Sequence, residues 1–295
     1  MPMVRALALF AAVLPLTLTA AKDLPRLART NLLAYRDVAS NAQRVKSVED
    51  WQHRRAEIVR GMERMMGVLP GSEKRCALDL KVEEETDCGS YVRRLITYLS
   101  EPGGRVPAYL LIPKDALSGK KKAPGILYPH PTDDTIGHKV VVGLGGRANR
   151  QYAVELAERG FVTLAPSYPL LVNYQPDLKA FGWESGTLKA VWDSMRGLDL
   201  LESLPFVNAK AGFGSIGHSL GGHNSIYTGV FDQRLKDSNF RWDSVDRVAT
   251  AAVQIYQLHG KPENLFIEHP DCDHDFPDAM RERAYNLFEL HLRAP

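Results

Sequence analysis

Cysteine is scarce in this sequence, with three residues among 295: Cys76, Cys88 and Cys272. So few cysteines exclude a disulfide-stabilised scaffold, and their spacing is not that of a metal site. Cys76 and Cys88 flank one predicted strand and turn, so a single disulfide between them and two unpaired thiols are alternative expectations. With 44% hydrophobic residues, a chain of this length is instead expected to fold around a sizeable apolar core.

Excess charge of either sign is also absent. Lys and Arg number 37 against 35 Asp and Glu, a formal net charge of +2. Proteins that bind nucleic acid through the phosphate backbone carry a clear basic excess, so no nucleic-acid partner is expected.

Long hydrophobic runs are missing beyond the N-terminus. The apolar run at residues 6–18 follows Arg5 and is about 13 residues long, shorter than the roughly 20 that span a bilayer as a helix. Small residues follow it, which is the layout of a secretory signal. We therefore predict that residues 1–21 are removed and that the mature protein is secreted or periplasmic, with no membrane segment after removal.

The rest of the chain divides into two predicted regions. Residues 22–75 show helical apolar spacing ended by Pro70 and Gly71, which indicates a helical N-terminal arm. Residues 76–295 form the main domain: three short β-rich runs up to residue 113 predict an antiparallel meander, and strands then alternate with helices. This alternation predicts an α/β fold with a mostly parallel sheet and helices on both faces.

Glycines at 212, 214, 217 and 221 fit two motifs that exclude each other. Gly212, Gly214 and Gly217 spell G-x-G-x-x-G, the dinucleotide-binding fingerprint, whereas Gly217, Ser219 and Gly221 spell G-x-S-x-G. The first motif needs a strand directly before it and an acidic residue at a second strand end about 20 positions later. Neither is present, so no dinucleotide cofactor is expected.

The G-x-S-x-G motif has the context it needs. A short apolar strand ends just before Gly217, and a helix is predicted from Leu220 to Val230. Ser219 would then stand on a sharp strand-to-helix turn, where larger side chains at Gly217 and Gly221 would collide. Ser219 is the predicted nucleophile.

A nucleophilic serine needs a base and an oxyanion hole. His274 is the predicted base, because it lies on a loop between an apolar segment predicted as a strand and an amphipathic helix, and it follows Ser219 in the chain. Leu220 N–H is one expected oxyanion donor. The loop after "GILYPHPTDDT" supplies the other; Pro131 has no N–H, so Thr132 or Asp133 is expected.

The segments "YPHPTDDTIGHKVVVGLGG", "GSIGHSLGGHN" and "DCDHDFP" together resemble secreted bacterial α/β-hydrolases of the dienelactone hydrolase and acetyl xylan esterase-like type. The resemblance runs from about residue 48 to the C-terminus. It implies an α/β-hydrolase fold, Ser219 as nucleophile and His274 as base. It also implies a small-molecule or carbohydrate ester as substrate, with no cofactor and no metal. The "DSNF" piece resembles the stretch that carries the acid, which makes Asp237 the candidate.

One departure concerns the stretch after the nucleophile helix. The chain is predicted to pass almost directly into another helix, so that the sheet is shortened by loss of the family's sixth and seventh strands. From Asp232 to Asp237 the chain reaches at most about 17 Å, barely enough to return along a helix of roughly 18 Å. If it does not return, the segment "NLFIEH" would pair beside the strand that precedes Ser219, and the acid would come from residue 271, 273 or 275.

Three alternatives to an esterase stay open. One is an exopeptidase or amidase with the same triad, and another is a catalytically impaired variant of the fold. A metalloenzyme using His269, Cys272 and His274 is disfavoured. The sequence does not predict an oligomeric state.

Overall fold

The computed structural model describes residues 26–28, 31–172, 174–237, 242–268 and 270–293, so the predicted signal at residues 1–21 lies outside it. The N-terminal arm holds a two-stranded hairpin, β1 (Ala34–Arg36) and β2 (Ala42–Arg44), followed by α1 (Val48–Met66) and a short 3-10 turn, η1 (Ser72–Lys74). The hairpin was not predicted. Ser47 and Asp50 form a capping box that starts α1.

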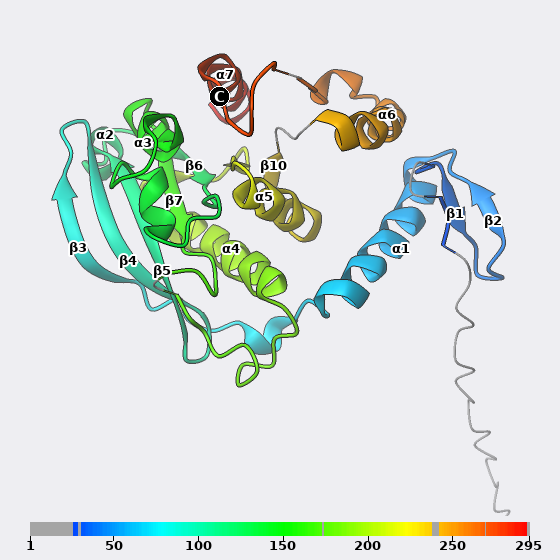
Figure 1. Ribbon diagram of the computed structural model, residues 1–295, viewed down its shortest axis with the longest axis horizontal. Coiled ribbons are helices and arrows are strands. Elements are labelled where there is room, and N and C mark those ends of the chain that lie inside the picture. Colours follow the sequence, from blue (N-terminus) through cyan, green and yellow to red (C-terminus); the bar gives the residue numbers. More distant parts are fainter. Residues whose placement is uncertain (1–25, 29–30, 173, 238–241, 269, 294–295) are drawn as a thin grey trace, which may run out of the picture.

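The arm extends sideways from the main domain, with the hairpin at its far end (Figure 1). It contacts the domain through hydrogen bonds and through the apolar side chains of Met66 and Leu69, which pack against a buried cluster around Trp183. Arg55 Nη2 donates to the Val230 carbonyl at 2.5 Å, and Ser185 Oγ donates to the Met66 carbonyl at 2.6 Å.

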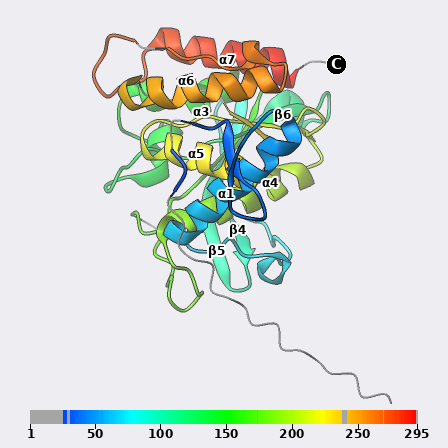
Figure 2. The same ribbon diagram turned by 90° about the vertical axis from the view of Figure 1, so that its right-hand side faces the viewer.

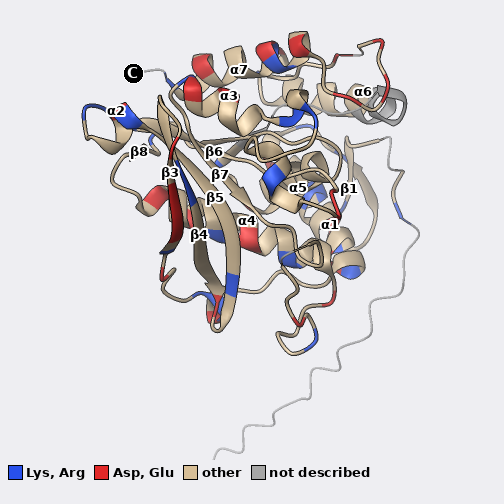
Figure 3. Ribbon diagram, turned by 60° about the vertical axis from the view of Figure 1, so that its left-hand side comes forward, with Lys and Arg blue, Asp and Glu red and all other residues tan. Residues whose placement is uncertain are grey.

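The main sheet begins with the predicted meander, which the structure confirms. β3 (Lys81–Asp87), β4 (Tyr91–Glu101) and β5 (Gly104–Pro113) pair antiparallel in chain order. β3 lies at the sheet edge and carries acidic side chains along its length (Figure 3). Charged side chains on an exposed edge strand discourage pairing with another chain.

The second half of the sheet is parallel. Its strands are β6 (Ala123–Leu127), β7 (Val162–Pro166), β9 (Phe213–Ser215) and β10 (Leu235–Asp237), and the short β8 (Val207–Asn208) pairs with β6. The order across the sheet is β10-β9-β6-β7-β5-β4-β3, with β7 antiparallel to β5. The sheet is therefore mixed, because the predicted meander and the predicted parallel strands join in one sheet.

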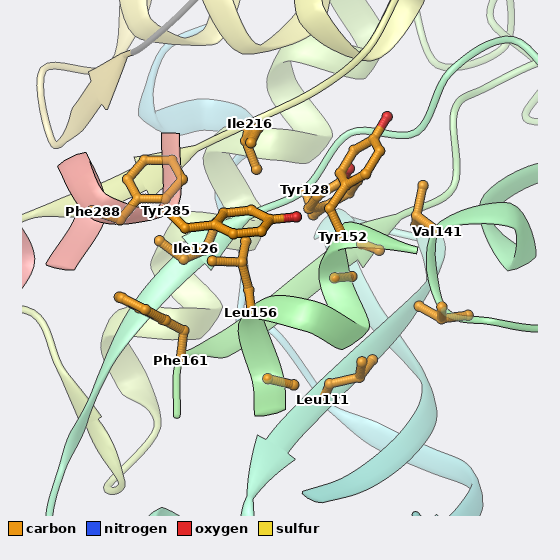
Figure 4. Close-up of a cluster of buried hydrophobic side chains, with 14 of the residues drawn as sticks. Leu111, Ile126, Tyr128, Val141, Tyr152, Leu156, Phe161, Ile216, Tyr285 and Phe288 are labelled. Carbon is orange, nitrogen blue, oxygen red and sulfur yellow. The ribbon is translucent and has the colours of Figure 1, made fainter. Parts of the chain in front are cut away.

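Helices cover both faces, as predicted. α3 (Tyr152–Glu158) and α7 (Asp278–Leu292) pack on one face, in a cluster that includes Tyr152, Leu156, Tyr285 and Phe288 (Figure 4). α4 (Gly186–Ser203) packs on the other face against strand side chains such as Ile96 and Leu164, with α5 (Leu220–Phe231) beside it. The remaining helical segments are α2 (Lys114–Leu117), η2 (Gly137–Val141), η3 (Ala148–Arg150), α6 (Trp242–Leu258) and η4 (Pro262–Asn264).

The chain after α5 differs from the expectation. It turns at Asp232 and returns as β10, parallel to β9, with Leu235 beside Phe213 and Asp237 beside Ser215. A strand therefore lies between the two helices, and the estimated reach was sufficient. Residues 265–268 form no strand, so "NLFIEH" does not pair beside β9, and His274 does not follow a strand.

Two further expectations concern cysteines and membranes. Cys76 and Cys88 are both free, so they do not form a disulfide. Within the residues that the structure describes, no helix combines the length and the apolar character needed to cross a bilayer. Figure 2 shows α1 crossing in front of the sheet when the molecule is turned by 90°.

Candidate active site

Ser219 stands at the turn between β9 and α5, as the motif predicted. Its backbone has φ 56° and ψ −122°, a strained conformation that non-glycine residues rarely adopt. It precedes the first residue of α5, and its side chain makes no capping hydrogen bond. The hydroxyl is therefore not used to cap the helix.

The two flanking glycines are required by close backbone approach. A Cβ at Gly217 would lie 2.3 Å from the Gly221 carbonyl carbon, and a Cβ at Gly221 would lie 2.2 Å from the Pro129 oxygen. Both distances are far below van der Waals contact. Gly214 has a different reason: its Cβ would lie 2.5 Å from Ile126 and 2.8 Å from Phe288, so a glycine here permits packing of the sheet.

The contact at Gly221 brings the start of α5 against the loop that follows β6. Leu220 is the first residue of α5, so its N–H is one of the donors that a helix leaves unpaired at its N-terminus. Thr132 and Asp133 follow on the same loop, with Thr132 exposed. Asp133 Oδ1 accepts the N–H groups of Thr135 and Ile136 at 3.0 and 2.7 Å, which shapes the loop.

His130 organises this loop from inside the protein. It is 1% exposed, its Nδ1 lies 2.7 Å from the Pro131 carbonyl, and its Nε2 accepts the Tyr168 N–H at 3.0 Å. This pattern requires the proton on Nδ1, and burial lowers the pKa of His130 to about 4. His130 is therefore neutral near pH 7 and has a structural role.

His274 lies beside the elbow. Its exposed ring packs against the ring of His218, the residue before Ser219, with centroids 4.4 Å apart. No hydrogen bond joins Ser219 and His274 in this structure, and such bonds commonly tighten only when substrate binds. Burial lowers the pKa of His218 to about 4, with the nearby Arg150 charge and His274 adding to the shift, so His218 is neutral near pH 7.

Asp237, the predicted acid, ends β10 at the level of Ser215, the last residue of β9. Its backbone therefore lies in the strand next to the nucleophile strand, near the carboxyl edge of the sheet. The Asp237 side chain is outside the part of the chain that the structure describes. Of the substitutes considered from the sequence, Asp271 and Asp273 are exposed.

Asp275, the third substitute, is held by two residues that the sequence did not point to. Asn149 Nδ2 donates to both of its carboxylate oxygens at 2.8 Å, and Arg150 forms an ion pair with it at 3.2 Å. Arg150 also donates to the His274 carbonyl at 3.2 Å. No sequence signal marks this contact, because the partners are about 126 residues apart.

The segment at residues 167–187 runs from β7 into the start of α4, and most of its aromatic side chains lie in or against the core. Tyr174 and Trp183 are buried: Tyr174 donates to Asp193 at 2.9 Å and Trp183 donates to Glu101 at 2.8 Å. Phe181 packs against the Trp183 cluster. Tyr168 is half-buried, and its hydroxyl lies 3.4 Å from Thr187 Oγ1.

The metal alternative gains no support. In the described ranges, no group of three or more His, Cys, Asp or Glu side chains is placed to hold a metal ion. His269, one of the three residues considered for it, lies outside those ranges.

Comparisons with known proteins identify the fold. Neither a family model nor a curated protein sequence matches the chain. Solved structures do match. BF1801 of Bacteroides fragilis, assigned as an acetyl xylan esterase, has a TM-score of 0.59 at 15% identity, covering 77% of both chains. The methylesterase BT1017 has a TM-score of 0.59 at 16% identity, covering 83% of this chain and 64% of that one.

A third similar structure is the glucuronoyl esterase from Solibacter usitatus, with a TM-score of 0.53 at 21% identity, covering 72% of this chain and 63% of that one. The chain has the α/β-hydrolase fold. The predicted resemblance to acetyl xylan esterase-like α/β-hydrolases is confirmed at the level of the fold. The chain spans less than two thirds of the methylesterase and of the glucuronoyl esterase.

Proposed function

We propose that this protein is a serine esterase that cleaves carboxylic esters, with acetyl and other acyl esters of carbohydrates as its substrate class. The observation that carries the proposal is the conformation of Ser219, which is strained at φ 56° between β9 and α5. Glycines lie on both sides of it, where any side chain would collide with neighbouring backbone. Three proteins of similar fold are named as esterases, which supports an ester substrate.

The proposed reaction has two steps. Ser219 Oγ attacks the ester carbonyl while His274 takes its proton, and the alcohol leaves with a proton from His274. Water then attacks the acyl-enzyme by the same route and releases the acid. Leu220 N–H and a donor on the loop at Thr132 or Asp133 stabilise the negative charge that forms on the carbonyl oxygen in both steps.

Asp237 is the proposed acid that orients His274. Its place at the end of β10 supports this role, since the adjacent parallel strands β9 and β10 end at the same edge of the sheet. Asp275 is less suited, because Asn149 and Arg150 already occupy its carboxylate. An Asp237→Asn variant should lose activity by up to about 10⁴-fold, as expected when the base loses its orienting carboxylate.

The test is hydrolysis of 4-nitrophenyl acetate and of acetylated xylo-oligosaccharides by the purified protein. Acetate release that is abolished by Ser219→Ala and by His274→Ala supports the proposal. Faster cleavage of aminoacyl 4-nitroanilides than of the esters would favour the peptidase alternative. A folded protein inactive on all of these substrates would favour the impaired variant.

We also propose export, with cleavage after residue 21. N-terminal sequencing of the protein recovered from the medium or periplasm of a bacterial host tests this. An intact N-terminus on protein retained in the cytoplasm would contradict it.

A further inference from the structure

The loop that carries the proposed base has no strand beneath it. Between η4 and α7, the described residues 265–268 and 270–277 do not join the sheet, whereas Ser219 lies four residues after the end of β9 at Ser215. A general base must be held within a fraction of an ångström of its working position. The structure therefore has to fix this loop by other means.

Side chains from η3 supply that support. Asn149 donates to both carboxylate oxygens of Asp275, and Arg150 binds the same carboxylate and the backbone carbonyl of His274. Arg150 is 8% exposed, so its charge is largely removed from water and depends on these contacts.

Asp275 stays ionised in this arrangement. Burial raises the pKa of its carboxyl, but the Phe276 N–H, the Asn149 amide and the Arg150 charge together bring it below its ordinary value. Hydrogen bonds to an ionised group are roughly twice as strong as those between neutral groups.

The segment that carries Asn149 and Arg150 also includes the loop proposed to supply an oxyanion donor. The segment between β6 and α3 begins near Pro129 and His130, whose backbone contacts Gly221. It ends with Asn149 and Arg150. This one segment therefore contacts both the start of α5 and the loop that carries His274.

We propose that Asn149 and Arg150 are positioning residues for His274, holding its loop at the elbow through Asp275 in place of a sheet strand. The proposal rests on the proposed function, in which His274 is the base. It assigns Asp275 to the loop anchor and leaves the role of the acid to Asp237.

Asn149 offers the cleaner variants, because it is only half-buried whereas Arg150 is in the core. Asn149→Ala removes two hydrogen bonds, and Asn149→Asp opposes two carboxylates. Each should lower kcat about 10²-fold with KM little changed, since displacing the base by about 1 Å has this cost. The double variant N149D/D275N restores an amide–carboxylate pair in reverse and should recover part of the rate, because Arg150 still loses its ion pair with Asp275.

Glu282→Gln is the matched control. It removes the 2.5 Å ion pair between Glu282 in α7 and Arg159, which lies just after α3. This pair is in the same part of the fold but away from the His274 loop. It should leave kcat unchanged. Wild-type kcat in Asn149→Ala and Asn149→Asp would overturn the proposal.

A second readout does not depend on activity. In Ser219→Ala protein, NMR should show a nuclear Overhauser contact between the rings of His218 and His274, which pack at 4.4 Å. Asn149→Ala should weaken or abolish this contact, and Glu282→Gln should not. Loss of the contact in a protein that cleaves no ester would support the positioning role and contradict the esterase; an unchanged contact in Asn149→Ala would overturn the positioning role alone.

Discussion

The nucleophile and the base of the proposed site are supported in different ways. Ser219 is fixed by backbone: β9 leads into it, α5 leads away, and Gly221 lies against the backbone of Pro129. His274 is fixed by side chains, through Asp275, Asn149 and Arg150. The backbone contacts of Ser219 involve residues of a local sequence motif, whereas the side-chain contacts of the His274 loop join distant segments. Substitutions in the two regions should therefore have different effects on stability and activity.

Gly221→Ala should lower both stability and activity, because it breaks the backbone-supported half of the site. The new Cβ would lie 2.2 Å from the Pro129 oxygen, so the loop or α5 must shift. We expect about 3 kcal/mol of destabilisation from overpacking. Activity should also fall about 10³-fold, because the oxyanion donors separate. Urea unfolding and ester hydrolysis measure the two effects.

Gly229→Ala in the same helix is the control. A Cβ there has only Leu235 Cβ nearby, at 4.0 Å, and alanine favours the helix by up to about 1 kcal/mol. Equal behaviour of the two variants would contradict the close contact at Gly221.

Lys189→Met tests the segment at 167–187, which is also fixed by side chains. Lys189 is fully buried and pairs with Glu101 at 3.1 Å and with Asp193, and both carboxylates also bind this segment through Trp183 and Tyr174. Removing one partner of a buried ion pair costs about 3–5 kcal/mol. Chemical denaturation should show this loss, while Lys120→Met, which removes a solvent-exposed pair, should leave the midpoint almost unchanged.

Stability should also fall in acid because of the loop beside the elbow. Burial lowers the pKa of His130 to about 4 and that of His138 to about 3, below the ordinary 6.5. Between pH 6.5 and 4 the unfolded chain binds protons that the folded protein does not, so stability decreases as pH falls through this window. At 1.36 kcal/mol per pKa unit, each histidine should account for a loss of folding free energy on the order of 3 kcal/mol across this window.

Replacing His130 with glutamine checks this by urea midpoints at pH 7.5 and 5. The variant should be less stable at pH 7.5 because the hydrogen bonds from Tyr168 and to Pro131 are disturbed, but it should lose less stability on acidification. An unchanged difference between the two pH values would contradict a neutral, buried His130.

The sequence predicted the elbow well because its evidence is local. A strand, a glycine-flanked serine and a helix follow one another within the stretch "AGFGSIGHSLGGHN", and steric contact requires the glycines. The return of the chain in β10 was underestimated. Its three residues need only reach the level of Phe213 to Ser215, which a turn at Asp232 to Arg234 allows.

The support of His274 was beyond sequence reasoning. "NLFIEH" has the apolar character of a strand, yet no neighbouring strand pairs with it among the described residues. Asn149 and Arg150 resemble any polar pair before a helix, and their contact with Asp275 exists only in the folded chain. The resemblance of "DCDHDFP" to a histidine loop indicated His274 as the proposed base, but it did not indicate which residues hold that loop.

The central claim is that Ser219 is an activated nucleophile, and fluorophosphonate labelling tests it most directly. Intact-mass and peptide mass spectrometry should show one adduct per chain, on Ser219, with labelling lost in Ser219→Ala and slowed in His274→Ala. A folded protein that takes up no label at saturating probe, or carries it on another residue, would contradict the account.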